Sequence, residues 1–460
     1  MPGFERSEED AEGCCPFCFG DQTTETLPEK VDEDSEVLLA FLDEHEADLI
    51  ELTQDLIGIE SQNPPGDTRE IIEYIEQYAT TLGLRTELVV EDEAKPNLLI
   101  TLPGKKETTL LYNGHVDTVP YEPDVWTHDP LGERDGDQIY GRGATDMKSA
   151  IAAMLHAVRA YVETGVVPPV TLQLAVVSDE ETAGDAGLRA LLDQDRLTAD
   201  ACVIGETTCE AGSHSVTIAD KGSIWLTLEA TGKAAHGSRP PLGENAIDRL
   251  FEAITELRER LRQVDFALDD EITPIVEESV SFYTPRMDRE TAWRLFTTPT
   301  VNVGTFEGGG TVNSVPEAAT AELDIRLTAG VHTPSILDQI ETLIQDHPAV
   351  EIADVSWSIG TYEPFDSPLV EATATLAESV ANETVLRRSA TGGGDAKTLR
   401  NEGVPTIEFA FGTDTAHAAD EYITVQALRN NARVFTKLPF GFAALTEAVG
   451  LSESEDSGSN

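Results

Sequence analysis

The chain has 460 residues, among which 85 Asp and Glu against 31 Lys and Arg give a formal net charge of −54. A polyanion would be repelled over most of such a surface, so nucleic acid is excluded as an expected partner. No apolar run approaches the roughly 20 residues that span a bilayer, and residues 1–10 are polar and acidic. We therefore expect an intracellular, cytoplasmic protein without a membrane or secretory segment.

The basic residues are mostly arginine, 22 against 9 lysines, and the acids are spread along the chain. This combination is typical of proteins adapted to high salt, where screening removes self-repulsion, and it predicts a halophilic cytoplasm. An acidic interaction tail would explain only residues 451–460.

Five cysteines are too few for a disulfide framework in a chain of this length. Cys14, Cys15 and Cys18 have the spacing of a zinc knuckle, but no second pair or histidine lies nearby to complete four ligands. Residues 1–35 show no periodicity and are predicted to be a disordered extension. A knuckle that closes by pairing two chains is the alternative.

Apolar spacing predicts helices at residues 36–59 and 68–82, followed by strands at 85–90 and 97–102. Helices and strands then alternate as far as Glu206, as expected of an α/β sheet whose functional loops lie at strand ends. The predicted catalytic domain covers residues 36–215 and resumes over 362–448 with a helix at 367–378 and a strand at 406–411, before an acidic tail at 449–460.

Residues 216–361 show a different pattern and are predicted to form an inserted lid and dimerisation domain. The predicted elements are a strand at 222–231, a helix at 245–262, strands at 300–306 and 319–327, a helix at 334–346 and a strand at 350–359. The order βαββαβ is that of a ferredoxin-like α+β domain. Residues 265–299 exceed what this topology needs and are interpreted as an insertion of unknown purpose.

Acids gather after an apolar run at residues 171–177, where Glu180 and Glu181 stand side by side. A buried strand that ends in such a cluster carries uncompensated charge and needs a binding partner. Further candidates at the ends of apolar segments are His115, Asp117, Asp146, Glu206 and His417. Two imidazoles and several carboxylates suit a pair of zinc ions.

The residue types suggest a division of roles. His115 and Asp117 are two positions apart and share a strand face, so Asp117 is expected to orient the imidazole rather than to bind metal. A dinuclear site about 3.5 Å across needs a bridging carboxylate, for which Asp146 is suited. Adjacent glutamates cannot easily point the same way, so one can bind metal while the other takes a proton from water. This chemistry predicts a hydrolase.

Each feature also has a purely structural interpretation. A His-x-Asp pair is commonly a polar strand end, the glutamate pair could be a solvated turn, and Asp146 could cap a helix at residues 147–164. Because all of these would have to hold together, the metal interpretation is favoured. The glycines at 392–394 lack the ending of a phosphate loop, so Gly393 and Gly394 are interpreted as an anion-cradling turn near the substrate carboxylate.

The chain resembles the M20 family of zinc metallohydrolases, which includes acetylornithine deacetylases, succinyl-diaminopimelate desuccinylases and glutamate carboxypeptidases. The matching stretches are residues 61–67, 114–120, 140–148, 179–181, 205–206, 235–240, 313–317, 324–326, 392–396 and 416–422. They occur in the family's order over residues 38–447. The resemblance implies a mixed-sheet α/β catalytic domain of the zinc-exopeptidase type with an inserted ferredoxin-like lid.

The resemblance also implies roles for individual residues. One zinc ion would be held by His115, Asp146 and Glu206, and the second by Asp146, Glu181 and His417, with cobalt as a possible substitute and Glu180 as general base. His236 matches a lid histidine that reaches the partner's site across a dimer interface and could stabilise an oxyanion. Arg326 and Asn313 match lid positions that meet the substrate, and Arg239 is a weaker candidate. Without the resemblance, these lid residues would be interpreted as surface groups.

The expected substrate is an N-acyl amino acid, with N-succinyl-diaminopimelate placed ahead of N-acetylornithine. A metallo-carboxypeptidase or dipeptidase is the alternative, and a non-catalytic binding protein is disfavoured because Glu180 and every proposed ligand are present. A homodimer through the lid is expected because residues 222–231 and 245–262 carry more apolar side chains than a small lid needs internally.

Overall fold

The structure, a computed structural model, describes residues 33–210 and 212–456. Cys14, Cys15 and Cys18, and with them the predicted knuckle, lie outside the described residues. Helix α1 begins at Glu33, so the last three residues of the predicted extension are helical.

The larger part of the molecule is built on a mixed eight-stranded sheet in the order β1-β2-β6-β3-β7-β14-β8-β13. The strands are, in this order, Arg85–Val89, Asn97–Leu102, Thr171–Val177, Thr109–His115, Ala201–Ile204, Thr406–Glu408, Ser215–Ala219 and Leu386–Ser389. Neighbours β6, β3 and β7 are parallel, so their carboxyl ends meet at one edge of the sheet.

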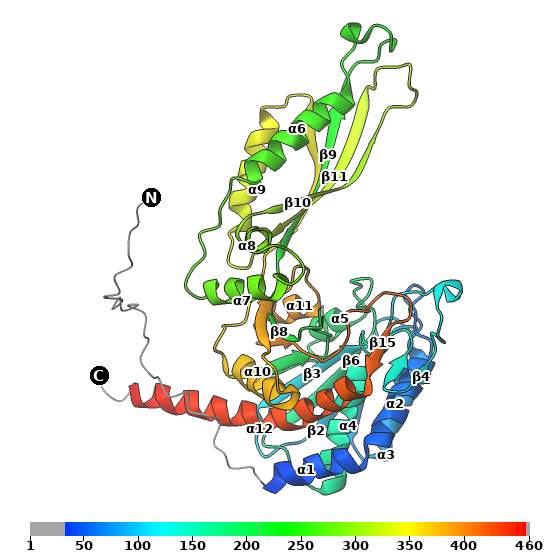
Figure 1. Cartoon of the computed structure of the whole chain (residues 1–460), viewed down its shortest axis with the longest axis vertical. Helices are drawn as coiled ribbons and strands as arrows, with labels where there is room; N and C mark the ends of the chain where they lie inside the picture. The colour runs from blue at the N-terminus through cyan, green and yellow to red at the C-terminus, as the bar shows by residue number, and fades with distance from the viewer. Residues whose placement is uncertain (1–32, 211, 457–460) are drawn as a thin grey trace, which may run out of the picture.

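Both faces of this sheet are buried, because successive side chains of a strand point to opposite faces. In β3, Leu110 and Tyr112 join one core cluster and Leu111 joins the other. The first face is covered by α1 (Glu33–Glu44), α2 (Glu46–Gly58), α3 (Arg69–Thr81), α4 (Lys148–Thr164), α10 (Pro368–Ala381) and α12 (Val425–Asp456), and the second by α5 (Leu188–Asp193) and α11 (Asp395–Asn401) (Figure 1). The predicted α/β class is confirmed.

Two details of the helices differ from the sequence predictions. The single helix predicted at residues 36–59 is two helices, because His45 leaves the helical conformation with φ −107° between α1 and α2. Helix α4 has Met147 at its N-cap without a side-chain cap hydrogen bond, so the interpretation of Asp146 as a mere helix cap is wrong.

A second, antiparallel sheet stands away from the larger part (Figure 1). Its order is β10-β11-β9-β12, with bounds Thr300–Gly308, Ala318–Leu327, Gly222–Thr231 and Val350–Ser358. Helices α6 (Ala246–Leu261) and α9 (Thr333–Gln345) pack on the face that carries Ile224, Leu226 and Leu228. On the other face no described helix packs, and Trp225 is 59% exposed there. The element order is the βαββαβ order that the sequence predicts.

A small three-stranded sheet, β15-β5-β4, lies beside the large sheet and supports two loops described below. Its strands are Tyr422–Thr424, Gln138–Tyr140 and Glu133–Asp135, and two short 3-10 helices, η1 and η2, cover Pro123–Val125 and Pro240–Leu242. Strand β5 pairs antiparallel with β15, which brings together segments more than 280 residues apart in sequence.

The predicted insertion at residues 265–299 contains helices α7 (Thr273–Tyr283) and α8 (Arg289–Thr297), which pack on the larger part through side chains such as Val280 and Phe296. Strand β13 is the edge of the large sheet, and two side chains of α7 cap it. The backbone N–H of Arg387 donates to Glu278, and that of Ser389 donates to Ser279 Oγ at 2.8 Å. The insertion thus protects an edge strand that would otherwise be open to pairing.

We expect Ser279→Ala to lower the free energy of unfolding by about 1–3 kcal/mol, because it leaves the buried N–H of Ser389 without an acceptor. Urea unfolding measures the effect. Ser281→Ala is the matched control, since Ser281 is exposed on the same helix and its hydroxyl donates only to Glu277 O at 2.9 Å. Equal losses in the two variants would contradict the edge-capping role.

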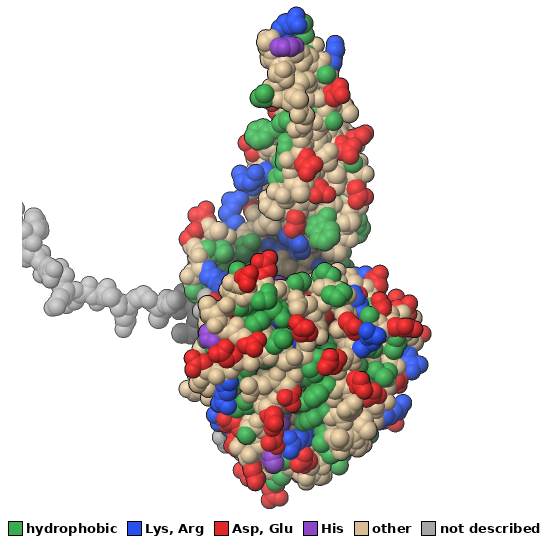
Figure 2. Space-filling model, turned by 90° about the vertical axis from the view of Figure 1, so that its right-hand side faces the viewer, with side chains coloured by type: hydrophobic (Ala, Val, Ile, Leu, Met, Phe, Trp, Pro, Cys, Tyr) green, Lys and Arg blue, Asp and Glu red, His purple; other side chains and the backbone are tan. Residues whose placement is uncertain are grey.

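Acidic side chains are distributed over both parts of the molecule on the face that Figure 2 displays, in keeping with the net charge. A hollow separates the two parts on the same face. Within the described residues, no helix combines the length and the apolar character needed to cross a membrane.

Candidate metal site

Three parallel strands deliver candidate ligands to one edge of the large sheet. Strand β3 ends at His115, Glu180 and Glu181 follow β6, and Glu206 follows β7. Because these strands are neighbours with aligned carboxyl ends, their terminal side chains lie close together. Asp146 is added from the loop before α4.

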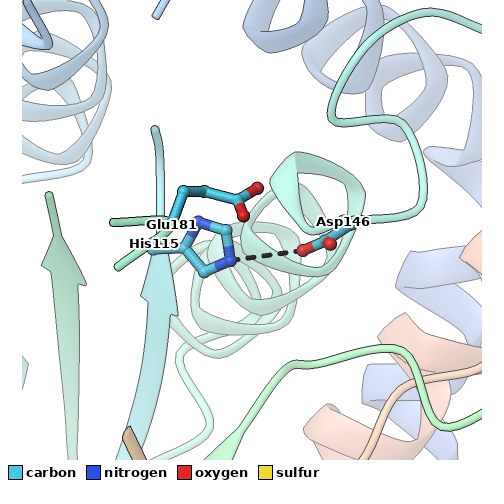
Figure 3. A group of neighbouring side chains, drawn as sticks. All are labelled: His115, Asp146 and Glu181. Carbon is cyan, nitrogen blue, oxygen red and sulfur yellow. Dashed lines mark ion pairs between the residues drawn. The ribbon is translucent and has the colours of Figure 1, made fainter. Parts of the chain in front are cut away.

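His417, on the loop between β14 and β15, completes a cluster with two halves. In the first half, His115 Nε2 lies 3.2 Å from Asp146 Oδ1 and 3.0 Å from Glu206 Oε1. In the second, His417 Nε2 lies 3.0 Å from Asp146 Oδ2 and 3.2 Å from Glu181 Oε2. Figure 3 shows His115, Asp146 and Glu181 pointing toward one another. The two oxygens of Asp146 therefore face different histidines.

The cluster fits the requirements of a metal site. Ligands of a tetrahedral zinc ion, at bond lengths near 2.0–2.2 Å, are separated by about 3.3 Å, which is close to the distances in each half. Asp146 Oδ1 is buried and, apart from its ionic contact with His115, has no hydrogen-bond partner among the described residues. Ligand atoms of His115, Asp146 and Glu181 also lie within 4.8 Å of one another. Nitrogen and carboxylate donors of this kind could hold zinc or cobalt.

The environment of His115 directs one ring nitrogen toward the cluster. Its Nδ1 lies 2.9 Å from the main-chain oxygen of Asp117, so Nδ1 donates to this oxygen and Nε2 is the nitrogen directed at the cluster. The Asp117 carboxylate is 3.6 Å from Nδ1 and accepts instead from Asn63 at 2.9 Å and from the backbone N–H groups of Glu180 and Glu181 at 3.2 Å each. Strand β3 ends at His115, so the predicted sharing of a strand face does not extend to Asp117.

Burial and charge together perturb the ionisable groups of the cluster. Burial opposes protonation of His115, but the carboxylates of Glu206 and Asp146 outweigh it and hold the pKa of the imidazole well above its ordinary value. Asp146 and Glu181 raise the pKa of His417 to about 10. Burial, with the charge of Asp146, raises the pKa of Glu206 well above its ordinary value. The cluster is a region of negative potential that favours a cation.

Glu180 differs from its neighbours because no described residue hydrogen-bonds to its carboxylate. Burial raises its pKa to about 7, and the nearby charge of Asp395 adds to the shift. A Cβ atom at Gly394 would lie 3.2 Å from Glu180 Oε1, so the glycine turn at residues 392–394 passes beside this carboxylate. Lys397 Nζ approaches the same turn at Gly393.

Two lid residues named by the sequence analysis, His236 and Asn313, lie at the far end of the four-stranded sheet. His236 is exposed on the loop after β9, bonds to Ser238 Oγ at 2.8 Å and pairs with Ser314 next to Asn313. Strand β9 begins directly after β8 of the large sheet, and its ten residues span ~30 Å. These residues therefore do not join the cluster of the same chain.

Arg326 lies at the opposite end of its sheet, close to the larger part. It sits on the helix-free face beside Ser223, and its guanidinium binds Asp324 at 2.7 and 3.1 Å. A substrate carboxylate at Arg326 would compete with Asp324. Arg239 lies on the His236 loop at the far end of the four-stranded sheet. Its backbone N–H donates to the main-chain oxygen of His236 at 2.8 Å.

The sequence analysis assigned no role to Glu421 or Arg142, which the structure places beside the cluster. Arg142 pairs with Glu421, and both are buried. A signal was available, since Glu421 is an acid four positions after His417 and directly before an apolar strand. Arg286, from the insertion, pairs with Glu210 and, at 3.3 Å, with Asp414, on the loops that carry Glu206 and His417.

The chain is similar to known proteins over most of its length. The family model described as peptidase family M20/M25/M40 matches residues 111–440. A succinyl-diaminopimelate desuccinylase from Paracoccus denitrificans is 30% identical over 366 residues, which cover 76% of this chain and 87% of that protein. A probable succinyl-diaminopimelate desuccinylase from Staphylococcus epidermidis is 28% identical over 393 residues, with coverage of 82% and 93%.

Solved structures share the fold at low identity. An M20 family metallo-carboxypeptidase from Sulfolobus solfataricus aligns with a TM-score of 0.69 at 20% identity, covering 90% of this chain and 100% of the other. Human carnosine dipeptidase 1 aligns with a TM-score of 0.67 at 18% identity, covering 89% and 99%. At such identities the likeness establishes the architecture alone.

Proposed function

We propose that this chain, which belongs to peptidase family M20/M25/M40 and is a metal-dependent amide hydrolase, uses two zinc ions to hydrolyse an N-acyl amino acid. The reaction would remove the acyl group from the amino acid. N-succinyl-diaminopimelate is the favoured substrate and N-acetylornithine the second candidate. Cobalt is a possible substitute for zinc.

The observation that carries this proposal is the position of Asp146. Each of its carboxylate oxygens lies 3.0–3.2 Å from a different histidine nitrogen, and each histidine has one further glutamate at a similar distance. His115, Asp146 and Glu206 would hold one ion, and Asp146, Glu181 and His417 the other. A shared carboxylate between two such sets supports a dinuclear centre.

The chemistry divides between the metals and Glu180. Zinc ions held by these residues would supply the Lewis acidity needed to polarise an amide carbonyl and to acidify water. Glu180, whose half-buried carboxylate has no hydrogen bond to a described residue, takes a proton from the attacking water and delivers it to the leaving amine nitrogen. The backbone N–H groups of Glu180 and Glu181 donate to the Asp117 carboxylate, which fixes the backbone that carries the base and the ligand.

The choice of acyl group rests on the relatives. The curated proteins at 28–30% identity are named as desuccinylases, whereas the solved structures include a carboxypeptidase and a dipeptidase at 18–20% identity. A peptide with a free carboxylate remains the alternative substrate. The Gly393 and Gly394 turn beside Glu180 and the Arg326 guanidinium are proposed to bind substrate carboxylates.

An assay of amine release distinguishes these substrates. The protein, loaded with zinc or cobalt in high salt, is incubated with N-succinyl and N-acetyl amino acids, including N-succinyl-diaminopimelate and N-acetylornithine, and with dipeptides. We expect the highest kcat/KM for the succinyl compound. A dipeptide as the best substrate would favour the peptidase alternative, and no release from any amide would refute the proposed function.

A homodimer through the lid is part of the proposal. His236 lies ~30 Å along β9 from the larger part, so only a second chain could bring it to the cluster. The groove between α6 and edge strand β10 has both apolar and polar lining, and two of its aromatic side chains, Phe251 and Phe306, are 63% and 39% exposed. The other lining residues are Ile254, Val303, Thr255, Arg258, Glu259 and Arg262. A second copy would cover this groove, continue the sheet at its edge and present His236 to the developing oxyanion.

Mixing of two inactive variants tests this arrangement. We expect His236→Ala chains and Glu180→Gln chains to recover about a quarter of wild-type activity after mixing, because half of the dimers are mixed and each holds one intact site. Neither variant regains activity alone. A monomer in solution together with no recovery on mixing would refute the dimer and the role of His236 across it.

A further inference from the structure

Glu421 is a fully buried carboxylate for which the proposed reaction has no direct use. It is 0% exposed and receives four donors. The backbone N–H groups of Thr145 and Asp146 donate to Oε1 at 2.9 and 3.0 Å, and the N–H of Gly143 donates to Oε2 at 3.1 Å. The Arg142 guanidinium also donates to Oε2. All partners are donors, so the ionised carboxylate is the form that fits.

The three N–H groups belong to the loop that ends at Asp146. Gly143 has φ +85°, a conformation that glycine adopts without strain, and it lets successive N–H groups point inward at one anion. Glu421 therefore fixes the backbone of Asp146 directly. A small rotation at this point would move both carboxylate oxygens, and each of them faces a different histidine.

Arg142 extends the same contact to the other loop. Its second guanidinium nitrogen donates to the main-chain oxygen of His417 at 3.3 Å, while the first holds Glu421. The loops are further joined by the Thr413 N–H, which donates to Thr145 Oγ1 at 2.9 Å, and by the pairing of β5 with β15. The planar fork of arginine suits two acceptors at a fixed separation, and a lysine has no such fork.

We infer that Glu421 and Arg142 are positioning residues that set the distance between Asp146 and His417, and thereby the metal affinity of the cluster. The inference rests on the proposed metal site and adds residues that touch neither metal nor substrate. Glu421 acts on both halves because Asp146 belongs to both. Arg142 acts mainly on the half that contains His417.

Titration of the apoprotein with Co²⁺, followed by visible absorption, tests the inference without an activity assay. We expect Glu421→Gln to weaken both binding steps by about 10–100-fold, as loss of a partner that orients a ligand does, because an amide presents N–H where two donors point. Arg142→Lys should weaken only one step by that factor. The weakened step should be the one that His417→Ala abolishes. The absorption spectrum of Co²⁺ bound in that step should also change.

A control variant separates positioning from general destabilisation. Asp220 is also a buried carboxylate between basic groups, with Lys397 at 3.2 Å and Arg400 at 3.0 Å, and it lies outside both loops. Asp220→Asn should lower the thermal unfolding midpoint while Co²⁺ affinity stays within twofold of wild type. Equal loss of affinity in Asp220→Asn and Glu421→Gln would refute the positioning role.

Three further outcomes of these experiments would each refute one of the claims. Wild-type affinity and an unchanged Co²⁺ spectrum in folded Glu421→Gln would overturn the inference alone. If Glu421→Gln does not fold, the Arg142→Lys variant provides the test. Unchanged Co²⁺ affinity in Arg142→Lys at the step that His417→Ala abolishes would overturn the inference. A wild-type protein that binds no Co²⁺ would instead refute the proposed dinuclear site itself, which distinguishes the two failures.

Discussion

Replacement of Glu180 by glutamine is expected to lower kcat by about 10²–10⁴-fold, the contribution typical of a general acid and base. The amide cannot take a proton from water or return one to the amine. The Glu180 carboxylate makes no hydrogen bond to another described residue, so the change removes no side-chain hydrogen bond. We therefore expect unchanged metal content and unfolding midpoint. Steady-state kinetics with metal analysis measure both quantities.

Glu181→Gln serves as the neighbouring control for this prediction. Glu181 Oε2 lies 3.2 Å from His417 Nε2, so its loss should reduce metal content together with activity. A Glu180→Gln protein with full metal content and near-normal kcat would show that another group moves the proton. Equal metal loss in both variants would show that Glu180 is a ligand.

The second large effect is expected for Asp146. We expect Asp146→Ala to lose both metal ions and all measurable activity, because each of its oxygens belongs to a different half of the cluster. His115→Ala and His417→Ala should each retain at most one ion, since each removes a ligand from one half. Metal analysis of protein dialysed against dilute zinc gives the stoichiometry.

Asp420→Asn is the matched control on the His417 loop. The Asp420 carboxylate accepts from Thr127 and from the His128 N–H at 2.8–3.0 Å, away from the cluster. This variant should keep the wild-type metal content. Two ions retained by Asp146→Ala would contradict the bridging role, and equal loss in Asp420→Asn would attribute the effect to the loop as a whole.

The insertion is the part of the chain to which the sequence analysis assigned no purpose. Through α7 it caps the edge strand β13, and through Arg286 it reaches Glu210 and Asp414. It therefore packs on the larger part, although in sequence it lies between elements of the four-stranded sheet. Long-range packing of this kind has no local signal, because the contacting residues are about 75–130 positions apart.

Strand ends were the most predictable part of the site. Strand β6 covers the apolar run Thr171–Val177 as predicted, and β2 and β9 also have their predicted bounds. Short continuous or alternating apolar runs are typical of strands in a buried sheet. Strand β14 ends at Glu408, three residues earlier than its apolar run. Periodicity failed at His45, since apolar spacing continues across a break that only backbone geometry reveals.

The sequence by itself determined the residue types of the candidate site and their order along the chain. Burying a charged group without a partner is costly, so charged residues at the ends of apolar strands can be identified as candidate ligands from the sequence. The convergence of His417 on Asp146, the contacts of the Asp117 carboxylate, and the link from Glu421 through Arg142 were decided only by the tertiary structure. These contacts join loops far apart in sequence, and their distances depend on how sheets and helices pack rather than on any local preference.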